Sequence, residues 1–302
     1  MNFAPILLFA YARPHHTKLT LEALLKNQGA ELSDIIIFSD GAKTADKQNS
    51  VDEVRAYLKT ITGFHSISIH ERPQNYGLAK SIIEGVTQVL KDNEQIIVLE
   101  DDMVTSPYFL TYMNESLNRF ADDDRVVSIH GYVYPVKQLL PEAFFLRGAD
   151  CWGWATWRRG WAHFNPDGQY LLNELKRRKL INAFNFNGAY SFSSMLVDQI
   201  NGRNDSWAVR WHAAAFLADK LTLYPGRSLV HNIGNDNSGT HSSKSNTHDA
   251  LLSATPINLK HVEVFPSVVG RQAFESFFWK SQGGFMQRMY HLLINIFART
   301  TL

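Results

Sequence analysis

Short apolar runs alternate with helical patterns through the first hundred residues, and this alternation limits the folds that the chain can adopt. Runs that predict strands lie at residues 6–11, 35–38, 67–69 and 95–99. Apolar residues at helical spacing lie between them, at residues 14–25, 51–61 and 78–90. Because parallel strands need a crossover connection, we expect an α/β fold with a mainly parallel central sheet flanked by helices.

The pattern is looser in the second half of the chain. We expect further helices at residues 109–120, 169–180, 190–200 and 207–217, and further strands at residues 126–129 and 221–224. Residues 148–157 form a segment rich in glycine and aromatic side chains. Residues 232–248 are polar and show no period, which predicts a loop.

Composition excludes several classes of protein. With 302 residues, of which 45% are hydrophobic and 20% charged, the chain has enough apolar side chains for a large core. A net charge of +1 argues against nucleic acid as a partner. The single Cys151 excludes an internal disulfide and fits a reducing compartment. The first eight residues do not resemble a signal peptide, and no run of about 18 apolar residues predicts a membrane-spanning helix.

Three carboxylates, Glu100, Asp101 and Asp102, follow directly after the apolar run at residues 95–99. In open α/β sheets, ligands bind just beyond the carboxyl ends of the strands. Carboxylates this close repel one another unless a cation or hydrogen-bond donors neutralise them. Hard oxygen ligands suit Mg²⁺ or Mn²⁺, which also bind substrate phosphates. We therefore expect a metal–diphosphate site, with an acidic loop before the helix near Pro107 as the structural alternative.

The C-terminal segment differs in charge from the rest of the chain. Residues 277–302 contain no acidic side chain but include Lys280, Arg288 and Arg299, and their apolar residues share one helical face. Such a helix either lies on a membrane surface or packs its apolar face on the domain or on a second subunit. Both interpretations remain open from the sequence.

Several segments together resemble the GT-A glycosyltransferases. Those in the first half are residues 7–14, 38–41, 75–80 and 98–102, and those in the second half are residues 147–154, 205–211 and 231–234. More narrowly, they resemble bacterial family-2-like sugar transferases and the N-acetylglucosaminyltransferases that begin complex N-glycan branching. The resemblance covers about residues 4–245 and leaves the C-terminal tail unexplained.

The resemblance implies a GT-A domain over residues 1–270 and an amphipathic helical tail over residues 271–302. Residues 1–125 would bind the nucleotide sugar, and residues 126–270 the acceptor. The implied reaction is a metal-dependent, inverting transfer from a nucleotide-diphosphate donor, most plausibly UDP-linked, to a glycan or lipid-linked acceptor in surface polysaccharide synthesis. The implied location is the cytoplasm or the inner face of the plasma membrane.

The resemblance also implies roles for the donor-side residues. Asp102 would ligate Mn²⁺ or Mg²⁺, while Glu100 and Asp101 would contact ribose, sugar or metal-bound water. Arg13 would meet the diphosphate or the nucleoside, although an arginine beside a helix start is also an ordinary surface residue.

Three further donor contacts have equally ordinary structural explanations. Asp40 would contact uracil or ribose, but an Asp-Gly pair also suits a turn. Lys80 would lie near the phosphates at a helix start, or be a solvated lysine. Asn75 orders the turn before that helix, with a donor contact as the second interpretation.

Transfer also needs a base for the proton of the acceptor hydroxyl. The resemblance implies Asp205, whose alternative role is to cap the helix that follows. Asp198 is the second candidate, although a solvated position on a helix explains it as well. For the metal, a late histidine of the polar loop is a further candidate, and we choose His241 over His231 and His248 because the loop around it could close over the donor.

The aromatic segment and its neighbours bear on sugar binding. Trp152, Trp154, Trp157 and Trp161 could pack against sugar rings, but we expect at least two of them to be core residues. Asp150 is either a ligand for sugar hydroxyls or a turn residue.

Two other functions remain open. A sugar nucleotidyltransferase would also use a strand-end metal, but the first strand is followed by Arg13 and Pro14 rather than by a glycine-rich loop. A non-catalytic carbohydrate-binding protein could have the same fold. A glycoside hydrolase fits less well, because adjacent acids on one strand end do not bracket a glycosidic bond.

Overall fold

A mixed sheet of eight strands forms the centre of the protein, in a computed structural model that describes residues 3–236 and 246–281. The strand order is β3-β2-β1-β4-β8-β6-β9-β7. The bounds are β1 Ile6–Ala10, β2 Asp34–Ser39, β3 Ser66–Glu71, β4 Gln95–Glu100, β6 Val126–His130, β7 Ala143–Arg147, β8 Trp154–Trp157 and β9 Leu221–Pro225. A separate antiparallel pair consists of β5 (Met103–Thr105) and β10 (Val230–Asn232).

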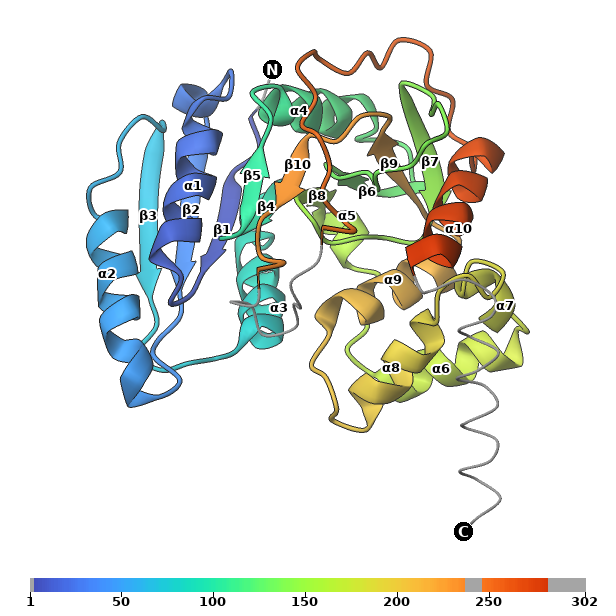
Figure 1. Ribbon diagram of the computed structural model, residues 1–302, viewed down its shortest axis with the longest axis horizontal. Helices are drawn as coiled ribbons and strands as arrows, with labels where there is room; N and C mark the ends of the chain where they lie inside the picture. The colour runs from blue at the N-terminus through green and yellow to red at the C-terminus, as the bar shows by residue number, and fades with distance from the viewer. Residues whose placement is uncertain (1–2, 237–245, 282–302) are drawn as a thin grey trace.

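Helices cover both faces of this sheet (Figure 1). Their bounds are α1 Pro14–Leu25, α2 Gln48–Leu58, α3 Leu78–Val89, α4 Phe109–Arg119, α5 Arg158–Trp161, α6 Gly168–Arg177, α7 Ile181–Phe184, α8 Phe192–Ile200, α9 Trp207–Leu217 and α10 Val268–Ser281. The mixed α/β fold expected from the sequence is confirmed.

The two faces of β1 show why the sequence folds in layers. Ile6 and Leu8 join one apolar cluster with α1, α2 and α4, whereas Leu7 and Phe9 join a second cluster with α3 and α9. Successive side chains of a strand point to opposite faces, so a continuous apolar run is buried on both sides.

The order of the strands positions the site. From β1 the chain adds β2 and then β3 on one side, whereas β4 pairs with β1 on the other side, and all four strands are parallel. The crevice where the strand order reverses is the usual ligand site of such sheets. Here it lies beyond the ends of β1 and β4, where Arg13 and the carboxylates of residues 100–102 are found.

The second half of the sheet differs from what the sequence pattern predicts. Strand β8 lies within the segment rich in glycine and aromatic residues, antiparallel to both β4 and β6, and β7 is antiparallel to β9. Helices α6, α7, α8 and α9 gather below this half of the sheet (Figure 1). Strand β8 is only four residues long and begins and ends with tryptophan, so it is too short to show a clear period of alternating side chains.

The C-terminal segment begins with a packed helix. Helix α10 starts at Val268 and contacts β7, and its buried side chains Phe274, Phe277 and Phe278 join a cluster with Phe144. The first part of the expected amphipathic tail therefore packs on the domain, and residues 282–302 lie outside the described part. None of the helices in the described ranges is long and apolar enough to cross a membrane.

Candidate functional site

The ends of β1 and β4 bring a cation against the carboxylates. A guanidinium nitrogen of Arg13 lies 2.9 Å from Asp102 Oδ2, and the same side chain forms a hydrogen-bonded ion pair with Asp101. The backbone N–H of Tyr11 donates to Asp101 Oδ2 at 2.9 Å. These contacts supply part of the neutralisation that crowded acids require.

Electrostatics show that the neutralisation is incomplete. Burial, together with the charge of Asp102, raises the pKa of Glu100 from 4.5 to about 8. Burial raises the pKa of Asp101 to about 6, although Arg13 opposes this shift. Burial disfavours the charged Arg13, but the two aspartates outweigh it and hold the guanidinium pKa above its usual value. One arginine therefore does not balance three carboxylates.

The residues present fit a divalent cation. Asp102 is buried, and its Oδ1 atom has no hydrogen-bond partner among the described residues. The described part of the chain contains no group of three or more side chains arranged as metal ligands. Mg²⁺ and Mn²⁺ sites that act on nucleotides use one or two carboxylates, with the remaining ligands from phosphates and water. An unpartnered carboxylate oxygen beside further acids suits that kind of site.

Strand β10 brings a second segment against the carboxylates. The backbone N–H of Ile233 donates to the carbonyl of Asp102 at 2.9 Å, and Gly234 comes so close that a Cβ there would clash with the Asp102 carboxylate. His16 Nε2 lies 3.1 Å from Asp236, which ties the same segment to α1. A glycine is therefore required at position 234 for the backbone to cover the site.

Asp40 and Asn75 order the loops beyond β2 and β3. The Asp40 carboxylate accepts backbone N–H groups from Tyr76 and Gly77 at 2.9–3.0 Å, and Asn75 donates to the carbonyl of Gly41 at 3.0 Å. The ordinary structural roles of both residues are thus present. The donor contacts expected of them stay predictions.

Lys80 lies in the first turn of α3. Its side chain is exposed, with the ammonium 4.5 Å from the centre of the Tyr76 ring and 3.7 Å from Glu84. A lysine in this position can reach a phosphate near the start of the helix, because its long side chain is not fixed by burial. That contact also stays a prediction.

The residues around the start of α9 bear on the expected base. Ser206, not Asp205, caps this helix, since its hydroxyl accepts the N–H of Val209 at 3.2 Å. The Asp205 side chain is 70% exposed and lies 3.7 Å from Arg210. Asp198 is paired with Arg203. The capping alternative for Asp205 is wrong, and its role as a base stays a prediction.

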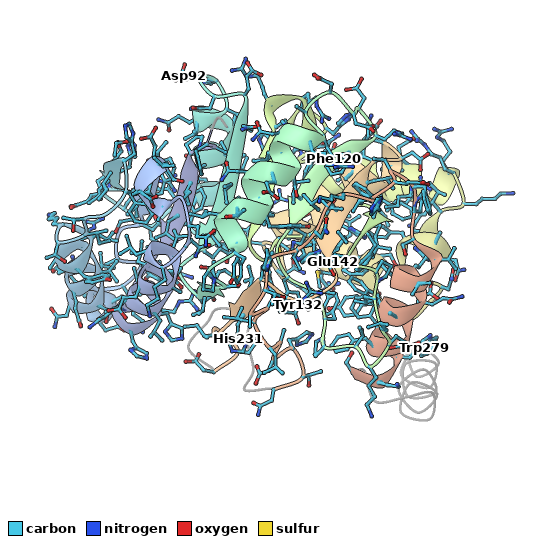
Figure 2. All side chains as sticks on the ribbon, turned by 90° about the horizontal axis from the view of Figure 1, so that it is seen from above. Asp92, Phe120, Tyr132, Glu142, His231 and Trp279 are labelled. Atoms are coloured by element: carbon cyan, nitrogen blue, oxygen red, sulfur yellow. The ribbon has the colours of Figure 1, made fainter. Side chains whose placement is uncertain are left out.

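The expected metal-binding histidine, His241, lies outside the described residues. His231 is on β10, opposite Val104 in β5, and its Nδ1 atom is buried without a partner among the described residues. Asp102 lies in the turn that leads into β5, two positions before Val104, so His231 lies opposite a residue that is close in sequence to Asp102. Figure 2 shows His231 and Tyr132 toward the same side of the molecule.

Three of the four tryptophans pack in the interior, as expected. Trp154, Trp157 and Trp161 are buried, whereas Trp152 is half-buried. Two residues that were not expected from the sequence contact Asp150, namely His130 at the end of β6 and Tyr224 in β9. No local motif marks them, because they are brought to Asp150 only by the pairing of strands distant in sequence.

Comparison with known proteins identifies the family. The model of glycosyl transferase family 2 matches residues 6–196, which is more than half of the chain. A search of the curated proteins found no match.

The solved structures that match this chain have low sequence identity to it and TM-scores below 0.5. The mannosyltransferase PcManGT from Pyrobaculum calidifontis, in complex with GDP-Man and Mn²⁺, is 14% identical with a TM-score of 0.34, over 43% of this chain and 35% of that one. Mannose-1-phosphate geranyltransferase from Thermus thermophilus is 13% identical with a TM-score of 0.41, over 78% and 77%. A UDP-glucose pyrophosphorylase complexed with UDP-glucose is 14% identical with a TM-score of 0.36, over 74% and 90%. The chain thus spans about a third of the length of the mannosyltransferase.

Proposed function

The chain belongs to glycosyl transferase family 2, and from that premise we propose that it transfers a sugar from a nucleotide-diphosphate donor to a glycan or lipid-linked acceptor, with inversion at the sugar carbon. The observation that carries this proposal is the unpartnered Asp102 oxygen beside Glu100 and Asp101, at the point where the strand order reverses. A donor with two phosphates and a divalent cation would complete that arrangement.

We assign the donor to residues 1–125 and the acceptor to residues 126–270. Asp102 holds Mn²⁺ or Mg²⁺, with His231 as the described histidine best placed to assist. A bound divalent cation supplies Lewis-acid stabilisation of the negative charge that develops on the leaving phosphate. Arg13 supplies further N–H donors to the diphosphate. Glu100 and Asp101 contact the ribose, the sugar or bound water.

The loops beyond β2 and β3 complete the donor site in this proposal. Asp40 and Asn75 shape the nucleoside pocket, because their hydrogen bonds order Tyr76, Gly77 and Gly41. Lys80 adds a positive charge at the start of α3. The nucleoside of the donor is uridine in this proposal, on the resemblance of the chain to the GT-A glycosyltransferases.

In the transfer step, an acceptor hydroxyl oxygen attacks the anomeric carbon of the donor. The new carbon–oxygen bond forms while the bond from that carbon to the phosphate oxygen breaks, and the nucleoside diphosphate leaves. Asp205 accepts the proton of the hydroxyl. Its open position before α9 supports this role, because an incoming acceptor can reach it.

The test is an assay of hydrolysis and transfer over a panel of UDP-, GDP- and dTDP-sugars, with Mn²⁺ and with a chelator. We expect release of a nucleoside diphosphate from at least one donor, only with Mn²⁺. Release or consumption of pyrophosphate would indicate a nucleotidyltransferase instead. Metal-independent glycan binding without turnover of any donor would indicate a carbohydrate-binding protein.

The role of Asp205 has a matched control in the chain. Asp205→Asn should lower kcat for transfer by about 10³-fold and leave the affinity for donor unchanged, because proton transfer is lost while donor contacts remain. Asp198→Asn removes an exposed, ion-paired carboxylate from the preceding helix and should leave kcat within about twofold. Similar kcat values for the two variants would mean that Asp205 is not the base.

A further inference from the structure

A second polar cluster lies on the part of the sheet formed by β6, β8 and β9. Asp150 precedes β8, and its Oδ2 atom is 3.5 Å from the Tyr224 hydroxyl and 3.7 Å from His130 Nε2. The backbone N–H of Cys151 donates to Asp150 Oδ1 at 2.8 Å, which fixes the carboxylate. The Asp150 side chain is 24% exposed, so a ligand can reach it.

The histidine of this cluster is left without hydrogen bonds. His130 is fully buried, and neither ring nitrogen has a hydrogen-bond partner among the described residues. Burial lowers the pKa of His130, which keeps the ring neutral. A buried polar group without a partner costs free energy, and in native structures such groups point to a missing ligand or water.

Aromatic side chains extend from this cluster, since the Tyr132 ring has its centroid 6.3 Å from that of His130. The rings of Tyr132 and Trp152 have centroids 4.7 Å apart, those of Trp152 and His248 are 5.6 Å apart, and those of Tyr134 and His248 are 6.1 Å apart. Trp152, Tyr134 and His248 are only half-buried. Aromatic faces pack against the apolar face of a sugar ring, and a carboxylate binds its hydroxyl groups.

The cluster is also close to the strand-end carboxylates. Burial, followed by the charges of Asp150, Glu100 and Asp102, raises the pKa of the Cys151 thiol. Strand β8 pairs antiparallel with β4, with Trp154 opposite Val98, so the segment just before β8 lies beside the end of β4. A ligand at Asp150 would therefore lie next to the proposed donor rather than at a remote site.

We propose that Asp150 binds the acceptor, accepting hydrogen bonds from two neighbouring hydroxyl groups of a sugar ring that packs against Trp152. This inference rests on the proposed transferase function and assigns to the acceptor a sugar with adjacent free hydroxyls. Asp150 orients the acceptor, whereas Asp205 takes the proton.

The test separates binding of the acceptor from binding of the donor. Methyl glycosides of glucose, galactose, mannose and N-acetylglucosamine serve as acceptors, and the one that the wild type glycosylates fastest is used for kinetics. Asp150→Asn keeps the shape of the side chain but removes its charge. We expect KM for that glycoside to rise about 30-fold, because hydrogen bonds to charged groups contribute about 1.5–3 kcal/mol. The Kd for Mn²⁺–UDP should stay within about twofold.

A charge-retaining variant and the exposed control complete the experiment. Asp150→Glu should recover part of the acceptor affinity, and Glu53→Gln, at an exposed carboxylate of α2, should leave KM unchanged. An unchanged KM in Asp150→Asn overturns the inference, and so does a fall in kcat alone, which would assign Asp150 to proton transfer. If the wild type itself neither binds Mn²⁺–nucleotide nor turns over any donor, the proposed function has failed before the variant is compared.

Discussion

The two parts of the sheet's carboxyl edge differ in both chemistry and construction. Around β1 and β4 the strands are parallel, and the side chains beyond them are the ion-paired Arg13, Asp101 and Asp102. Around β6, β8 and β9 the pairing is mixed, and the side chains are aromatic rings around one carboxylate, Asp150. Charged side chains dominate the first part, whereas flat apolar rings dominate the second.

This difference matches the two kinds of group that a sugar transferase must hold. A diphosphate is bound through cations, which here would be Arg13 and a divalent ion held by Asp102, whereas a sugar needs aromatic faces and a few hydroxyl acceptors. The parallel strands end together and concentrate charged residues at one crevice. The antiparallel strand β8 instead starts at that edge, so the aromatic segment before it extends the surface beside the crevice.

The largest effect should come from removing the arginine of the charged part. Arg13→Gln leaves the buried aspartates without their cation, so we expect the free energy of unfolding at pH 8 to fall by roughly 4 kcal/mol. Urea denaturation in the presence of a chelator measures it. The fall should be smaller at pH 5, where protonation relieves the repulsion. Equal stability of variant and wild type at pH 8 would mean that the ion pairs of Arg13 do not stabilise the buried carboxylates.

The charged part should also make stability depend on pH. Glu100 titrates near 4.5 in the unfolded chain and at about 8 in the folded one, so between these values the folded state holds a proton that the unfolded state has released. Stability should therefore decline by roughly 3.5 kcal/mol as pH rises from about 5 to 8. In Glu100→Gln the decline should shrink to the smaller part that Asp101 contributes, because the pKa of Asp101 is raised to about 6. The decline should also shrink when Mn²⁺ is present. A decline of the same size in Glu100→Gln would assign it to other groups.

The glycine that approaches Asp102 tests how β10 completes the charged part. In Gly234→Ala the added methyl group displaces either β10 or the Asp102 carboxylate. We expect affinity for Mn²⁺–UDP to weaken about tenfold, equivalent to about 1.4 kcal/mol, by isothermal calorimetry. Gly202→Ala is the control for backbone strain away from the site, because φ at Gly202 is +70° and the added methyl group would meet no atom within 4 Å. Unchanged affinity for Mn²⁺–UDP would mean that the segment after β10 does not contribute to nucleotide binding.

The smallest effect should come from the aromatic part. Tyr224→Phe removes one long contact to Asp150, at 3.5 Å, and leaves the ring in place. We expect KM for the acceptor to change about threefold and the affinity for Mn²⁺–UDP not to change. A larger effect on the nucleotide than on the acceptor would break the division between the two parts.

The sequence predicted the charged part well because its information is local. Each parallel strand is a short apolar run, and the candidates Arg13 and Asp102 follow β1 and β4 within three positions. Once a parallel sheet is expected, the ends of its strands meet at one edge.

The aromatic part could not be predicted in the same way. His130, Asp150 and Tyr224 come from three strands or their flanks, and only the pairing of β6 with both β8 and β9 brings them together. Capping at α9 was also missed, because Asp205 and Ser206 are both good cap residues and the choice depends on where the helix starts.

The central claim is that a divalent cation on Asp102 holds the diphosphate of the donor. Calorimetric titration of UDP and GDP into the wild type and into Asp102→Asn, each with Mn²⁺ and with a chelator, tests it most directly. We predict one-to-one nucleotide binding by the wild type only with Mn²⁺, and its loss in Asp102→Asn with the fold retained by circular dichroism. Equal affinity in the two proteins, or binding of the wild type indifferent to Mn²⁺, would contradict the claim.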